Sequence, residues 1–95
     1  MIILNLYYKI NPGKKEEFLN EVYSLGIVKN TQAENGCIAY DFYPSYDKDV
    51  VLLVEKWADD ESLNAHKEQE HLKKLLSLKE KYGIITTVEA FTQNS

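Results

Sequence analysis

The sequence predicts an α+β fold whose elements follow one another in the order βαββαβ, the arrangement of ferredoxin-like proteins. Both ends of the chain, 2–10 and 84–92, show the period-two alternation that is typical of strands. Two further strand-like segments, 38–43 and 50–57, are joined by a short polar loop and predict a hairpin. Between these strands, apolar residues recur at the spacing of helices. The whole chain, 1–95, is expected to form a single domain.

The first strand is followed by a turn and then by a helix. Apolar groups lie on both faces of 2–10, which indicates that both faces of the sheet are covered. The turn formers of 11–13 end this strand. Apolar residues such as Phe18 and Val22 recur at helical spacing over 14–31 and predict a helix there.

The second helical region cannot be a single straight helix. At about 100° per residue, Leu63 and His66 would point more than ~100° away from the later apolar stripe, so one rod could not bury both sets. We therefore expect a short helix over 60–66, a break at 67–69, and a second helix that ends near Tyr82.

Composition excludes several classes of protein. Eleven Lys, no Arg and fifteen acidic residues give a net charge of −4, which argues against nucleic-acid binding. No stretch reaches the ~20 apolar residues that cross a bilayer, and the N-terminus does not resemble a signal peptide. The single Cys37 rules out an internal disulfide and suits a reducing compartment, so we expect a cytoplasmic protein.

Both histidines of the chain fall in the second helical region. His66 shares a side of its helix with Leu63 and should face the sheet, where an imidazole with a pKa near neutral can accept a proton from a phenol. A hydrogen-bonded core histidine is the alternative. His71 is expected to have a packing role in the first turn of the next helix. The pair is a poor metal site, because residues five apart lie ~140° apart on one helix and the His-Glu-x-x-His spacing is absent.

Aromatic residues supply candidates for a substrate pocket. Tyr40 and Phe42 would line it if their strand face, which they share with Ile38, points toward the helices. Trp57 is expected to be a packing anchor that can also touch a ligand, and Tyr82 is a further candidate. A buried Glu55 would need a partner such as Lys, Tyr or His.

Several short segments occur in a fixed order along the chain: Asn11-Pro12-Gly13-Lys14, Glu17-Phe18, Glu34-Asn35-Gly36-Cys37-Ile38-Ala39-Tyr40, Glu55-Lys56-Trp57-Ala58-Asp59, Leu63-Asn64-Ala65-His66 and His71-Leu72. In this order they resemble the antibiotic biosynthesis monooxygenase family over nearly the whole chain. The resemblance is fairly specific for the fold and much less so for the reaction.

The resemblance implies a homodimer, a dimeric α+β barrel in which two sheets lie face to face with the helices outside. It also implies a pocket between sheet and helices in each subunit. Some members use dioxygen there to oxidise quinols or polyketide phenols without metal, flavin or haem, so no cofactor is expected. A hydrogen bond at the dimer interface is then the expected role of Glu55, and orientation of an imidazole is the alternative.

Other branches of the family carry out different reactions. One branch degrades haem with an Asn, a Trp and a His, and alignment places Leu6, His66 and Leu76 at those positions, so haem degradation is not expected. A further relative isomerises a phosphorylated signal and shares the His-x-x-x-x-His spacing, which therefore does not separate the reactions.

We therefore expect a monooxygenase that acts on a quinol-like or polyphenolic small molecule, with His66 as the catalytic base. The alternatives are an isomerase of a small phosphorylated or carbonyl compound, or a non-catalytic dimeric module that binds a small ligand. No nucleic acid, membrane or metal is expected to take part. The expected substrate-binding residues are Trp57, Tyr40, Phe42, His71, Leu6 and Tyr82.

Overall fold

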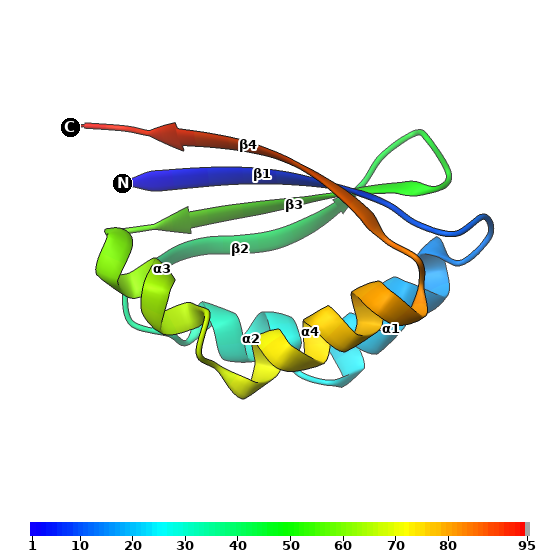
Figure 1. Cartoon of the computed structure of the whole chain (residues 1–95), viewed down its shortest axis with the longest axis horizontal. Coiled ribbons are helices and arrows are strands. Elements are labelled where there is room, and N and C mark those ends of the chain that lie inside the picture. Colours follow the sequence, from blue (N-terminus) through cyan, green and yellow to red (C-terminus); the bar gives the residue numbers. More distant parts are fainter. Residues whose placement is uncertain (95) are drawn as a thin grey trace.

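A four-stranded antiparallel sheet carries helices on one of its faces (Figure 1). The computed structural model describes residues 1–94. The strand order is β2-β3-β1-β4, and β1 and β4, at the two ends of the sequence, lie side by side. The predicted α+β, ferredoxin-like fold is confirmed. The elements are β1 (Ile2–Lys9), α1 (Lys15–Ser24), α2 (Ile27–Gln32), β2 (Cys37–Pro44), β3 (Val50–Trp57), α3 (Asp60–His66), α4 (Glu70–Lys81) and β4 (Ile85–Thr92).

The helix expected over 14–31 is in fact two helices, α1 and α2. Gly26 separates them with a φ of 74°, a left-handed conformation that a right-handed helix cannot contain and that glycine adopts without strain. The change of direction buries Ile27 and Thr31 completely against the core. This correction matters for function, because α2 leads directly into the turn that carries Glu34.

The predicted break between the last two helices is confirmed. Helix α3 begins after Asp59, whose side chain accepts a hydrogen bond from the backbone N–H of Ser62. It ends at His66, and the extended backbone of Gln69 precedes α4. Because the axis changes at the break, His66 and the α4 residue Leu75 are both buried, which one straight rod would not allow.

The helix-facing side of the sheet forms the core. Residues alternate along β3 so that Val51, Leu53, Glu55 and Trp57 are buried beneath the helices. Strand β2 contributes the buried rings of Tyr40 and Phe42, but not Ile38, which is 55% exposed. A register irregularity between Cys37 and Ala39 shifts Ile38 out of the alternation, so the expected common face begins only at Tyr40.

No helix within residues 1–94 lies over the opposite face of the sheet (Figure 1). Its register positions hold apolar side chains that are half-buried or exposed, including Ile3, Tyr7, Leu52, Val54 and Phe91. Among residues 1–94, no helix combines the length and the apolar character that a membrane span requires. The sequence predicted that both faces of the sheet are apolar and covered. Within a single chain, helices cover only one of the two faces.

Candidate active site

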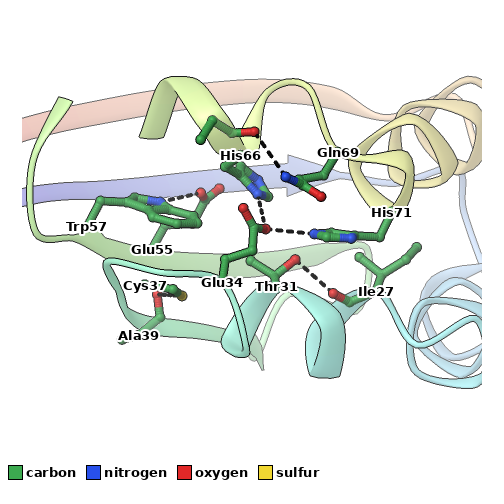
Figure 2. A network of polar contacts seen from close by, with 11 residues as sticks. Ile27, Thr31, Glu34, Cys37, Ala39, Glu55, Trp57, His66, Gln69 and His71 are labelled. Carbon is green, nitrogen blue, oxygen red and sulfur yellow. Dashed lines mark hydrogen bonds and ion pairs between the residues drawn. The ribbon is translucent and has the colours of Figure 1, made fainter. Parts of the chain in front are cut away.

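Glu34 lies between the two histidines (Figure 2). Its Oε2 accepts hydrogen bonds from Nδ1 of His66 at 2.7 Å and from Nε2 of His71 at 2.6 Å. The three side chains are only 10%, 4% and 11% exposed, respectively. A carboxylate can only accept hydrogen bonds. This one oxygen therefore fixes the orientation of both rings, and it requires the proton to be on Nδ1 of His66 and on Nε2 of His71.

The break between α3 and α4 brings the imidazoles together. His66 is the last residue of α3 and His71 lies in the first turn of α4, and their ring centroids are 5.9 Å apart. On one continuous helix the same spacing would set them ~140° apart. The geometric argument against a metal site, which assumed a single helix, therefore does not hold.

The turn that carries Glu34 is packed tightly against α3. The backbone carbonyl of Gly36 accepts a hydrogen bond from the N–H of Ala58 at 2.8 Å. Gly36 has a φ of 80°, and a Cβ there would lie 2.0 Å from Oγ of Ser62. A glycine is therefore required for the close approach that places the Glu34 carboxylate against His66.

Trp57 and Glu55 support the His66 ring from the sheet. The Trp57 and His66 rings are 4.7 Å apart, and the indole Nε1 donates to Oε1 of Glu55 at 3.0 Å. Burial raises the pKa of Glu55, and the Trp57 hydrogen bond and the neighbouring His66 partly oppose that rise. The expected partner of Glu55 was Lys, Tyr or His; the observed one is the indole of its own strand.

A hollow of about 210 Å³ lies between the sheet and the α3–α4 pair, and His66 forms part of its wall. Since Nδ1 is bound to Glu34, the remaining nitrogen, Nε2, is without a hydrogen-bond partner in the part of the chain that the structure describes. The volume is below the roughly 300 Å³ usual for small-molecule sites. Most of the wall is apolar and is formed by Leu4, Leu6, Leu63, Leu72, Leu75 and Leu76.

The amino-acid sequence matches the model of the antibiotic biosynthesis monooxygenase family over residues 1–77. The chain belongs to this family. A relative in Bacillus subtilis (strain 168), named "Putative monooxygenase YcnE", is 38% identical over 72 residues, which make up 75% of this chain and 74% of the relative.

Solved structures of similar proteins share the fold of this family member. One is a Bacteroides thetaiotaomicron VPI-5482 protein of unknown function, described as a possible oxidoreductase. It is 26% identical, with a TM-score of 0.82 over 95% of this chain and 94% of that one. Another, named "Putative antibiotic biosynthesis monooxygenase", comes from Nitrosomonas europaea. At 19% identity its TM-score of 0.85, over 98% of each chain, shows likeness of fold.

The wall of the hollow contains Leu6 and His66, two of the residues expected at the substrate pocket, together with Leu76. Five other residues expected at the pocket are absent from its wall as residues 1–94 form it. Tyr40, Phe42 and Tyr82 are core residues, Trp57 packs behind His66, and His71 is held by Glu34.

The residue that sequence reasoning missed is Glu34. It stands in one of the segments that carry the family resemblance, but no partner for it could be read from the sequence. The only signal in the sequence is that Glu34 is an acidic residue in a short turn, and its carboxylate meets both imidazoles only because the helix break directs the two rings to one point.

Proposed function

We propose that this protein is a cofactor-independent monooxygenase that oxidises a quinol or a similar small polyphenol. The observation that carries the proposal is the pairing of Glu34 with Nδ1 of His66 beside the apolar hollow. This bond holds the proton on Nδ1 and leaves the lone pair of Nε2 available to a bound phenol. A carboxylate that orients an imidazole in this way is a recurring arrangement for general bases.

In the proposed reaction, His66 takes a proton from one phenolic hydroxyl group of the substrate. The phenolate transfers one electron to dioxygen, and the resulting radical pair combines to form a carbon–oxygen bond while the apolar wall excludes water. Loss of water leaves a hydroxylated quinone. One quinol and one dioxygen thus give one hydroxyquinone and one water, and the quinol supplies all the electrons. Lys79 lines the hollow and can stabilise the phenolate; burial lowers the pKa of this lysine.

Oxygenation of menadiol under ¹⁸O₂ tests the proposal. We expect the protein to form hydroxymenadione that carries one ¹⁸O atom, measured by mass spectrometry, whereas spontaneous oxidation gives unlabelled menadione. Leu76→Trp should lower the yield because it blocks the mouth of the hollow. Leu25→Trp, the same change at an exposed leucine that follows α1 and does not line the hollow, should leave the yield unchanged. Absence of labelled product above the protein-free background, with menadiol and with catechols, would contradict the proposal.

We further propose that the protein is a homodimer joined through the helix-free face of the sheet. Light scattering should then give twice the 11.0 kDa of one chain. Val54 lies in a central strand on this face, so Val54→Asp should favour the monomer by placing a charge in the interface. Tyr46→Asp, in a fully exposed loop, should leave the dimer intact. A wild-type mass of a single chain would refute the assembly.

Two observations favour the other functions. The small volume of the hollow suits a module that binds a ligand without transforming it. Lys67 and Lys79 in its wall suit an isomerase of an anionic compound. Native mass spectrometry of the protein as purified identifies the ligand class: a retained phosphorylated compound supports isomerisation, whereas a retained quinone fits a monooxygenase or a binding module. Formation of ¹⁸O-labelled product then separates the monooxygenase from the binding module.

A further inference from the structure

We propose that Glu34, His66 and His71 form a binding site for one divalent transition-metal ion of the Zn²⁺ or Co²⁺ type. Each residue offers one ligand atom, and the three atoms lie within 4.8 Å of one another. They come from three separate elements: the turn before β2, the end of α3 and the start of α4. Two imidazoles and a carboxylate are a ligand set used for such ions in proteins, with further positions left for water or substrate.

The distances require only side-chain adjustment to accept an ion. Zinc binds imidazole nitrogen at about 2.0–2.1 Å, so two ligands at a tetrahedral angle lie roughly 3.3 Å apart. Oε2 of Glu34 is now 2.7 Å and 2.6 Å from the two nitrogens. This oxygen lies between the two nitrogens, at the place that an ion would occupy. Binding therefore requires the Glu34 side chain to rotate about its own torsion angles so that the carboxylate moves aside. The two rings already face this point (Figure 2).

The site has an approach that is separate from the leucine-lined hollow. Glu34 lines a second hollow of about 370 Å³, together with Ala33, Asn35, Ala65 and Gln69. The main chain and the side-chain amides of Asn35 and Gln69 can form hydrogen bonds with a hydrated cation as it approaches the carboxylate. The ligand set also predicts selectivity: Mg²⁺ and Ca²⁺ prefer oxygen ligands, and here two of the three donors are nitrogen.

Metal binding and the proposed base exclude each other. An ion on Nδ1 of His66 leaves the ring proton on Nε2, the nitrogen available to the substrate, so the metal-bound ring cannot accept a proton. The metal site does not depend on the proposed oxygenase reaction, and its test measures binding alone.

Zn²⁺ titration of tag-free, chelator-treated protein tests the site. Isothermal calorimetry should show one strong site per chain, and excess Mg²⁺ should not compete. Glu34→Gln and His71→Ala should each weaken binding by more than about tenfold, since loss of an outer-shell partner alone costs about that much. Glu68→Gln, an exposed acid in the α3–α4 break, and Cys37→Ser should bind as the wild type does.

A second measurement uses the unsubstituted protein, so it does not depend on whether the variants fold. With two histidines in the chain, ¹⁵N-edited spectra contain two imidazole spin systems. One equivalent of Zn²⁺ should shift both, with the largest changes at Nδ1 of His66 and Nε2 of His71. Unchanged imidazole signals, no saturable binding, or loss of binding in Cys37→Ser would each overturn the proposal.

Discussion

Replacing His66 with alanine is expected to lower the rate of quinol oxygenation by about 10²–10⁴-fold, the usual contribution of a positioned general base. His66 is buried, its Nδ1 is held by Glu34, and its ring lines the hollow. With the imidazole gone, the carboxylate left in the wall as residues 1–94 form it is that of Glu55, whose Oε1 already accepts the indole hydrogen bond of Trp57. The rate is measured as labelled hydroxymenadione formed per minute, with the free energy of unfolding recorded in parallel.

His71→Ala is the matched control for this experiment. His71 contacts the same Glu34 oxygen but is outside the wall of the hollow that residues 1–94 form, so its loss should reduce the rate much less. Equal rates for wild type and His66→Ala, in folded proteins, would remove His66 from the mechanism. Equal losses in the two variants would instead indicate that the histidines act only by holding the site together.

Replacing Trp57 with alanine is expected to reduce the free energy of unfolding by about 3–5 kcal/mol, the range found for buried Trp and Phe. Trp57 is completely buried, packs on His66 and donates the hydrogen bond that Glu55 accepts. The loss is a large part of the 5–15 kcal/mol that stabilises a typical domain. Urea unfolding followed by far-ultraviolet circular dichroism measures it without depending on tryptophan fluorescence.

Trp57→Phe separates packing from hydrogen bonding. Phenylalanine keeps most of the buried ring surface but leaves the Glu55 carboxylate without its indole donor. The expected cost is about 1–3 kcal/mol, that of one unsatisfied buried polar group. A Trp57→Ala loss below about 1 kcal/mol, by contrast, would mean that the ring is not the packing anchor that its burial indicates.

The helix break shows how far local patterns determine this fold. The orientation of Leu63 and His66 relative to the later apolar stripe is a property of the sequence, because helical geometry is constant. It predicted the break that the structure contains between α3 and α4. The Gly26 break was missed because a single glycine is tolerated inside many helices, and the sequence does not show which backbone conformation that glycine adopts.

The candidate site was predictable only in part. His66 could be predicted to face inward, because its helix has a defined apolar side. The rings of Tyr40 and Phe42 were expected in a pocket wall, yet they fill the core. Strand alternation assigns a residue to a face of the sheet, but it cannot say whether that residue meets a helix or a hollow.

The order of the elements, the helix break and the inward position of His66 could be predicted, because each follows from a periodic pattern along the chain. The contacts of Glu34 with both His66 and His71 could not be predicted, and neither could the meeting of two rings whose spacing would separate them on one helix. Residues 34 and 66 are brought together by the packing of a turn against the end of a helix. Such a long-range contact leaves no periodic trace in the sequence.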